Sequence, residues 1–250
     1  MSSIRCRVLM LVLPLVLTAM AAAAASPATV GKPAVPKGPQ PAFAPLHTPP
    51  TNALILFNGR DLRNWHPRDG RPLAWKIKNG VMTAAGADIV TNQKFTDAII
   101  HVEFREPQRP DRERGNSGVY LQGRYEIQVI DSYGTKIPGK GDCGAIYDQF
   151  APLVNASKPP FEWQSYDIIF RAPRVDASGK VIERARMTVL QNDVLIHNNV
   201  EVLGPTGSAL DDRVTEPGPL LLQYHGSALQ YRNVWVVPLP LKGSDTYQGR

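Results

Sequence analysis

Short runs in which apolar and polar residues alternate recur along the chain between residues 54 and 237. None of them extends into the long 3.6-residue apolar repeat of an amphipathic helix. Alternation with a period of two is typical of β-strands that bury one face, so the runs predict strands. The expected strands are residues 54–57, 75–77, 81–84, 98–105, 118–121, 125–130, 166–171, 186–190, 194–197, 220–224 and 229–237.

Turn signals separate these runs. Asn58-Gly59, Asn79-Gly80, Ser178-Gly179 and Asn192-Asp193 each supply residues that tolerate positive φ or close a turn with a side chain. Many short strands without crossover helices favour antiparallel pairing in two packed layers. The pattern therefore predicts an all-β fold, a two-sheet antiparallel jelly-roll sandwich.

The N-terminal part has a different composition. Basic residues precede an apolar run from Val8 to Ala25 that ends in small residues, as in a secretory signal peptide. Pro14 interrupts this run, which disfavours the alternative of a membrane anchor. We expect a signal peptide over 1–25, a Pro-rich tether over 26–50, one jelly-roll domain over 51–241 and a tail over 242–250. The product is expected to be exported, periplasmic or extracellular, with no membrane contact after signal cleavage.

Charge and cysteine content narrow the function classes further. The chain has 28 Lys and Arg residues against 22 Asp and Glu residues. The basic residues are spread without a dense run or interleaved aromatics, so nucleic acid is not an expected partner. Signal cleavage removes Cys6 and leaves Cys143 alone, which excludes an internal disulfide. His47 lies in the tether, where no function is expected for it.

The segment from Gly115 to Gly134 carries the densest group of polar side chains in a strand pattern. With a period of two, its core-facing positions are Val119, Leu121, Tyr125, Ile127 and Val129. Its other face then presents Tyr120, Gln122, Glu126 and Gln128. Asp131 has the wrong parity to join Glu126 unless a β-bulge near Val129–Ile130 inserts one extra residue. We therefore expect a bulge there, with two carboxylates and an amide on one face.

A series of motifs in this order makes the chain similar to a known family. They are Leu56–Trp65, Trp75–Gly80, Glu103–Arg105, Asn116–Gly118, Tyr125–Asp131, Gly144–Tyr147, Glu162–Trp163, Leu222–Gly226 and Tyr231–Asn233. Together, from about Leu54 to Val237, they resemble the 3-keto-disaccharide hydrolase family. The resemblance implies a jelly roll of the concanavalin-like lectin/glucanase type. Laminarinase-type enzymes carry Glu-x-Asp-x-x-Glu on a strand, whereas this chain has Gln128 and Asp131 at the last two acid positions.

The resemblance also implies a reaction. A ketone at C3 of a sugar acidifies the proton on C2, so a base can form an enolate that expels the anomeric group before water adds back. Such a reaction needs a base with a raised pKa, donors around the enolate oxygen and a second proton-transfer group. Glu126 is the expected base, and Asp131 or His225 is the expected partner.

The remaining candidates would bind the sugar. Asn116, Gln128, Gln223 and Arg232 would contact the ketone oxygen or hydroxyl groups, and Tyr120, Tyr147 and Trp163 would stack on the ring. A divalent cation held by Asp131, Glu126 and His225 would polarise the ketone, although no compact ligand spacing marks a zinc or iron site. The metal therefore stays open at this point.

Three functions follow from these features. The first is an exported enzyme that cleaves 3-keto-glucosides or 3-keto-disaccharides, with an oxidised sugar or glycan as substrate. The second is a non-catalytic carbohydrate-binding module, and the third is an endo-β-glucanase. Gln128 and the shorter Asp131 disfavour the third, because a retaining glycosidase needs two suitably spaced carboxylates. The exact sugar, the aglycone and the oligomeric state are not determined by the sequence.

Overall fold

A computed structural model of the chain describes residues 47–106 and 115–242. The predicted signal peptide, most of the predicted tether and nearly all of the predicted tail lie outside these residues. In the described part, no helix is long and apolar enough to span a membrane. The predicted all-β class is confirmed, because the elements of this part are strands joined by turns and loops.

The strands follow the predicted runs closely. They are β1 (Leu54–Phe57), β2 (Trp65–Pro67), β3 (Lys76–Lys78), β4 (Val81–Thr83), β5 (Ile89–Phe95), β6 (Ala98–Arg105), β7 (Asn116–Leu121), β8 (Tyr125–Ile130), β9 (Gln164–Arg171), β10 (Arg174–Val175), β11 (Val181–Glu183), β12 (Arg186–Gln191), β13 (Val194–Glu201), β14 (Gly218–Leu222) and β15 (Gln230–Pro238). Four of them, β2, β5, β10 and β11, lie outside the predicted set.

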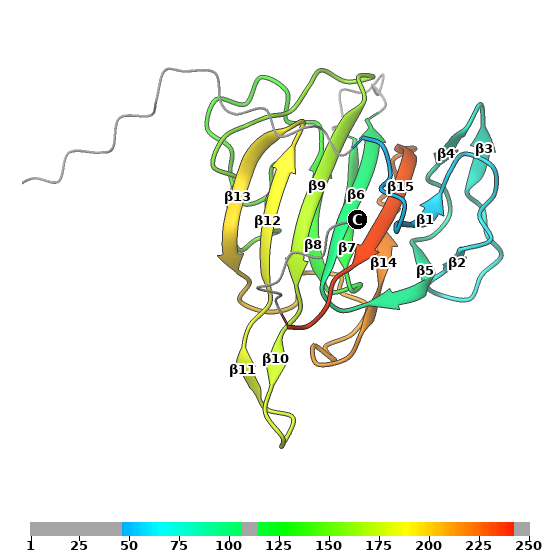
Figure 1. Ribbon diagram of the computed structural model, residues 1–250. Coiled ribbons are helices and arrows are strands. Elements are labelled where there is room, and N and C mark those ends of the chain that lie inside the picture. Colours follow the sequence, from blue (N-terminus) through cyan, green and yellow to red (C-terminus); the bar gives the residue numbers. More distant parts are fainter. Residues whose placement is uncertain (1–46, 107–114, 243–250) are drawn as a thin grey trace, which may run out of the picture. The chain divides into compact units, whose positions relative to one another are not determined.

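Two antiparallel sheets pack face to face (Figure 1). The eight-stranded sheet has the order β13-β12-β9-β6-β15-β4-β3, with β1 also paired to β15, and the five-stranded sheet has the order β2-β5-β14-β7-β8. The small β10–β11 hairpin projects from one end of the sandwich. The predicted jelly-roll sandwich is therefore the observed architecture.

The core lies between the two sheets and follows the period-two pattern. Every second residue of β7 and β8 is buried in it, and the partner strands of the other sheet contribute large apolar side chains in the same way. The five predicted core residues of this hairpin, Val119, Leu121, Tyr125, Ile127 and Val129, all belong to the core cluster. Tyr120, Glu126 and Gln128 consequently face outward from the five-stranded sheet.

The predicted bulge in β8 is absent, and this part of the prediction is wrong. β7 and β8 pair in an unbroken register from Leu121 opposite Tyr125 to Asn116 opposite Ile130. Asp131 follows the end of β8, where its Oδ1 accepts a hydrogen bond from the backbone N–H of Tyr133 at 3.1 Å. Without an inserted residue, strand parity does not bring Asp131 onto the face of Glu126.

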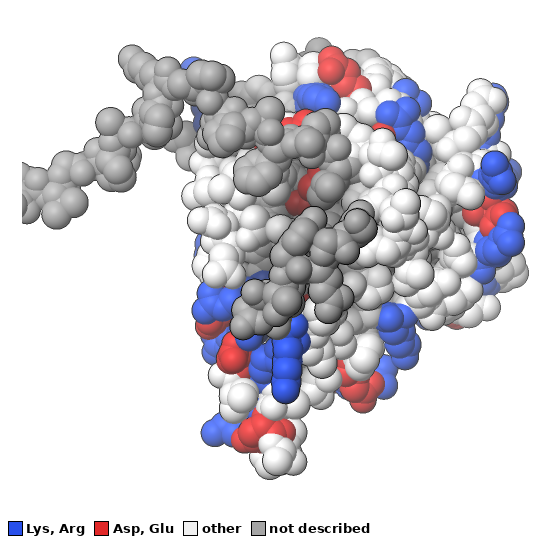
Figure 2. Space-filling model, in the orientation of Figure 1, with Lys and Arg blue, Asp and Glu red and all other residues white. Residues whose placement is uncertain are grey.

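The edge of the sandwich near the β10–β11 hairpin carries both signs of charge. Figure 2 shows basic and acidic side chains next to one another there. Three ion pairs join Arg171 to Glu183, Arg186 to Glu201 and Arg174 to Asp97. The first two pairs are exposed and add little stability, whereas the Arg174–Asp97 pair is largely buried. All three prevent this edge from forming a patch of one sign.

Candidate active site

Glu126 occupies the outer face of the five-stranded sheet, in the middle of β8. Its carboxyl group lies over Gly118 on the neighbouring strand, so closely that a Cβ at Gly118 would collide with Oε1. The same Cβ would lie only 2.7 Å from Cε2 of Tyr120. Glycine is therefore required at 118, because the acid fills the space that a side chain would take.

The hydrogen-bond partners of Glu126 are uncharged groups. The hydroxyl of Tyr120 lies 2.8 Å from Oε2 of Glu126, and Nε2 of Gln223 donates to that hydroxyl at 3.0 Å. The backbone N–H of Glu126 donates to Oγ1 of Thr206 at 3.0 Å. The residue is only 3% exposed.

This environment changes the acidity of Glu126. Burial disfavours the charged form and raises the pKa, the hydrogen bond from Tyr120 lowers it, and the negative charge of Asp88 raises it again. The net result is a pKa of about 7 instead of the ordinary value of 4.5 for a glutamate side chain. A carboxyl group with this pKa can accept and return a proton near neutral pH.

Arg68 and Asp88 belong to this site although the sequence pattern did not single them out. Nη1 of Arg68 donates to Oδ2 of Asp88 at 3.0 Å and to the carbonyl of Ser208 at 3.0 Å. Tyr120 reaches the same loop, because its hydroxyl lies 3.1 Å from the carbonyl oxygen of Gly207. Arg68 and Tyr120 thus both hold the loop that contains Gly207 and Ser208 next to Glu126.

His225 and Asn116 lie farther along the same face. The side-chain amide nitrogen of Asn116 is 2.8 Å from Nδ1 of His225. Because an amide nitrogen can only donate, Nδ1 accepts this hydrogen bond and the ring proton lies on Nε2 in the neutral form. His225 is exposed, so this N–H is open to solvent or to a bound molecule.

Tyr147 and Gln128 are also close to the acid. The backbone N–H of Tyr147 donates to the carbonyl of Glu126 at 3.2 Å, and its ring lies beside Gly207. Gln128 shares the face of Glu126 and is buried, with Oε1 accepting from the N–H of Val129 at 3.0 Å. The predicted residues that the structure brings together here are Asn116, Tyr120, Glu126, Gln128, Tyr147, Gln223 and His225.

Three predicted residues do not join them. Asp131 follows β8 without the bulge that would re-aim it. Trp163 and Arg232 lie at the eight-stranded sheet, where the guanidinium of Arg232 sits 4.1 Å from the centre of the Trp163 ring. β15 pairs with β6 and not with β14, so Arg232 contacts Glu103 instead of the Glu126 site.

The predicted metal ligands are likewise not the ones that the structure groups. In the described part of the chain, the set of His, Cys, Asp and Glu side chains with ligand atoms within 4.8 Å of one another is His47, His101 and Glu103. Asp131, Glu126 and His225 do not form such a set among these residues. The described residues therefore do not support the predicted metal site at Glu126.

Residues 53–237 match the 3-keto-alpha-glucoside-1,2-lyase-like domain. The match covers most of the chain, so the protein belongs to this family, as its motifs predicted. No curated protein matches the chain at a significant level.

Solved structures agree with this assignment. A proposed glycosyl hydrolase from Parabacteroides distasonis is 38% identical, with a TM-score of 0.68, and the alignment covers 76% of this chain and 84% of that one. A second proposed glycosyl hydrolase from the same organism is 20% identical, with a TM-score of 0.55 and coverage of 76% and 94%. The second supports the fold alone, whereas the first is also similar in sequence.

Proposed function

We propose that this protein cleaves 3-keto-glucosides, with Glu126 as the base that removes the proton from C2. The observation that carries the proposal is the buried carboxyl group of Glu126, whose pKa is raised to about 7. A ketone at C3 makes the C2 proton acidic enough for such a base. The match to a 3-keto-alpha-glucoside-1,2-lyase-like domain supports the same substrate class.

The reaction would begin as an elimination. Glu126 takes the C2 proton, the electron pair of the C–H bond forms the enolate, and the negative charge moves to the C3 oxygen. The enolate then re-forms the ketone and expels the aglycone from C1, which leaves a double bond between C1 and C2. Nε2–H of His225, fixed in this tautomer by Asn116, is the group that we assign to protonate the departing oxygen.

Water completes the hydrolysis. It adds its oxygen to C1 of the unsaturated ketone and gives one proton back to Nε2 of His225, and the protonated Glu126 returns its proton to C2. The products are a 3-keto-sugar and an alcohol, so one water is consumed and no oxidant is needed. A hydrogen-bond donor such as the side-chain amide of Gln223 would stabilise the oxygen that carries the developing charge.

The alternatives use the same face differently. An endo-β-glucanase would need a second carboxylate across the sugar from Glu126, and Asp131 does not reach that face. A carbohydrate-binding module would need the polar and aromatic groups but not the raised pKa of Glu126. The proposal includes export of the protein to the periplasm or the medium, on the basis of its N-terminal sequence.

Incubation with matched sugars tests the proposal. The purified protein should release sugar from 3-keto-trehalose or a 3-keto-glucoside and leave trehalose unchanged, because only the ketone acidifies C2. Absence of release from every keto-sugar tested, together with binding of unmodified glycans, would favour the binding module. Release from laminarin or lichenan would favour the endo-β-glucanase instead.

A further inference from the structure

A second buried polar cluster lies on the outer face of the eight-stranded sheet, away from Glu126. His101 and Glu103 are neighbours on one face of β6, and Asp167 lies opposite His101 on β9. On the other side, β15 places Trp235 opposite His101, with the two rings stacked at 5.1 Å. This cluster takes no part in the chemistry assigned to Glu126.

His101 is held in one tautomer with its second nitrogen unused. Nδ1 lies 2.7 Å from Oδ1 of Asp167, so the carboxylate accepts a hydrogen bond from Nδ1–H. Nε2 is completely buried and has no hydrogen-bond partner. Its nearest charged neighbour is Oε1 of Glu103 at 3.6 Å. In the neutral ring, a lone pair on Nε2 thus faces a carboxylate oxygen, an arrangement that a cation between the two would stabilise.

Glu103 is fixed in position by its other contacts. Its Oε2 accepts from Nε of Arg232 at 2.5 Å, and its Oε1 accepts from Nδ2 of Asn233 at 2.8 Å. Asn233 lies in a register shift of β15 and has a positive φ of 47°. β15 therefore contains a bulge that the sequence analysis did not predict, and it aims Asn233 at Glu103.

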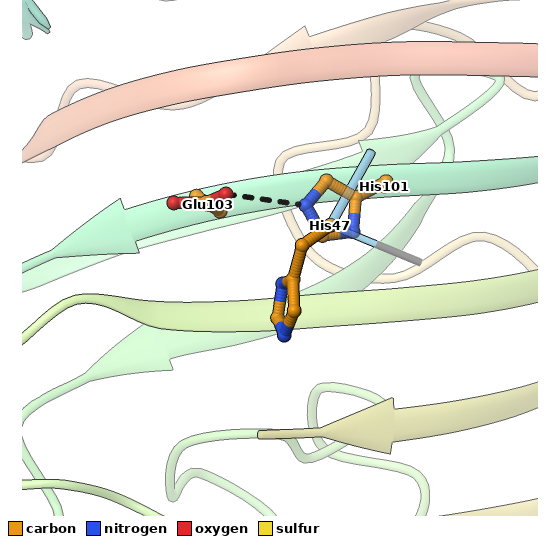
Figure 3. Close-up of side chains that lie close together, drawn as sticks. All are labelled: His47, His101 and Glu103. Carbon is orange, nitrogen blue, oxygen red and sulfur yellow. Dashed lines mark ion pairs between the residues drawn. The ribbon is translucent and has the colours of Figure 1, made fainter. Parts of the chain in front are cut away.

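His47 completes the cluster from a distant part of the sequence. Its carbonyl accepts a hydrogen bond from Nδ2 of Asn233 at 2.7 Å, which holds the backbone over the sheet. The His47 ring lies edge-on to that of His101, with the ring centres 5.8 Å apart. Nε2 of His47 is 3.8 Å from Oδ2 of Asp193, which leaves Nδ1 as its nitrogen for a ligand. Figure 3 shows His47, His101 and Glu103 close together.

We propose that His47, His101 and Glu103 bind a divalent transition metal, with Zn²⁺ as the best fit to two imidazoles and one carboxylate. Their ligand atoms lie within 4.8 Å of one another. Ligands about 2.0–2.2 Å from a tetrahedral Zn²⁺ are separated by roughly 3.4 Å. Rotation of the partly exposed His47 side chain closes most of this difference without moving β6.

The surroundings match those of metal sites in proteins. Asp167 on Nδ1 of His101 is the carboxylate that commonly orients a metal-binding histidine. Arg232 offsets one negative charge, while Asp167 and Asp193 supply two more around the histidines. A cavity of about 310 Å³ borders the cluster and is lined by His47, Glu103, Trp163 and Arg232, among others. The fourth coordination position would open toward this cavity and take a water molecule.

The role that we infer for the metal is structural. Two of the ligands belong to β6, whereas His47 is the first residue that the structure describes. One metal ion would therefore fasten the segment before β1 to the outer face of the eight-stranded sheet. Zn²⁺ binds the folded arrangement and not the unfolded chain, so it should raise the melting temperature.

Titration of the purified protein with Zn²⁺ alone tests this site. The protein should carry no histidine tag, be stripped with a chelator, and then be titrated with ZnCl₂ by calorimetry and with CoCl₂ by visible absorption. We expect one metal per chain, the visible bands of a low-symmetry Co²⁺ site, and a melting temperature raised by about 5 to 10 °C at one hundred times the Kd.

Variants of the proposed ligands and of a control histidine show where the metal binds. His47→Ala should weaken the affinity for Zn²⁺ at least tenfold and abolish most of the thermal shift, and it should fold because the His47 side chain is partly exposed. Asp167→Asn should weaken binding about 10- to 100-fold. His66→Ala is the control, since His66 is exposed on the other sheet and contacts Asn92. The proposal is overturned if the wild type binds neither metal, or if His47→Ala binds as tightly as His66→Ala.

Discussion

Glu126 and Glu103 are two buried glutamates on opposite sheets of one sandwich, and their surroundings give them opposite properties. Burial raises the pKa of both. At Glu103, the nearby His101 ring and the hydrogen bonds from Asn233 and Arg232 together outweigh burial and lower the pKa to about 2. At Glu126, burial dominates, and the pKa rises to about 7. Burial alone therefore does not identify a base, because the charge of the neighbours decides the protonation state.

The two sites also differ in how the chain assembles them. The Glu126 site is centred on two strands of one hairpin, β7 and β8, with a loop over it. The Glu103 cluster joins β6, β9 and β15, and receives His47 from the beginning of the described chain. The first arrangement suits reversible proton transfer beside a bound sugar. The second brings a carboxylate and two imidazole rings within reach of one another, which suits a cation.

The largest expected effect concerns turnover. Glu126→Gln should lower the rate of keto-sugar cleavage by about 10² to 10⁴-fold, because the amide cannot accept the C2 proton. Glu183→Gln is the matched control, since Glu183 is an exposed partner of Arg171 on the small hairpin. Sugar release under saturating substrate measures both. Equal rates for the two variants would remove Glu126 from the mechanism.

A pH-dependent stability difference should accompany this loss. Folded Glu126 keeps its proton up to about pH 7, whereas the unfolded chain releases it near pH 4.5. The unfolded state therefore binds fewer protons between these values, and the free energy of unfolding falls as the pH rises. Glu126→Gln should gain about 3 kcal/mol relative to wild type between pH 4 and pH 8.

Urea denaturation of both proteins at several pH values gives this difference directly. The comparison needs only the change in the wild-type to variant difference with pH, so other titrating groups cancel. A constant difference across the range would mean that the pKa of Glu126 is not raised.

A smaller but specific effect is expected at Gly118. Gly118→Ala should lower turnover about tenfold or more, since the new methyl group collides with the carboxyl of Glu126 and displaces it by a fraction of an ångström or more. Gly204→Ala is the control, because its position has open space and an ordinary φ. Kinetics and melting temperature together separate loss of function from loss of fold. Normal turnover in Gly118→Ala would contradict the observed packing.

The smallest expected effect distinguishes the outer face of the five-stranded sheet from that of the eight-stranded sheet as the site of sugar binding. Tyr147→Ala should weaken sugar binding, whereas Trp163→Ala should leave KM and kcat within about twofold, because Trp163 stacks with Arg232 on the other sheet. Measurement of both constants on a keto-glucoside checks this. A strong loss in Trp163→Ala alone would move the sugar site to the eight-stranded sheet.

Local pattern predicted much of this structure. The alternation in β7 and β8 identified both the core residues and the outward face of Glu126, because strand parity is a property of neighbouring residues. β5 was missed, since polar residues from Thr91 to Lys94 interrupt its apolar pattern. β5 pairs with β2, and this pairing brings Asp88 and Arg68 together at the site. Because the pairing is long-range, no local sequence pattern identified these two residues.

Long-range strand pairing explains why the positions of Arg232, of the bulge and of His47 were not predicted. The family motifs place Arg232 and His225 near each other in sequence, but the chain crosses from one sheet to the other between β14 and β15. A bulge is decided by the partner strand as well as by the bulged one, so it occurs at Asn233 and not at Ile130. His47 meets β6 only through tertiary contacts.

Hydrogen exchange at C2 of the sugar tests the central assignment most directly. A non-cleavable 3-keto-sugar, incubated in D₂O with the protein, should gain deuterium at C2 with a rate that rises with pH and levels off above about pH 7, following ionisation of Glu126. Nuclear magnetic resonance follows the exchange without requiring bond cleavage. The account predicts rapid exchange with wild type and background exchange with Glu126→Gln. Equal exchange with both proteins would contradict it.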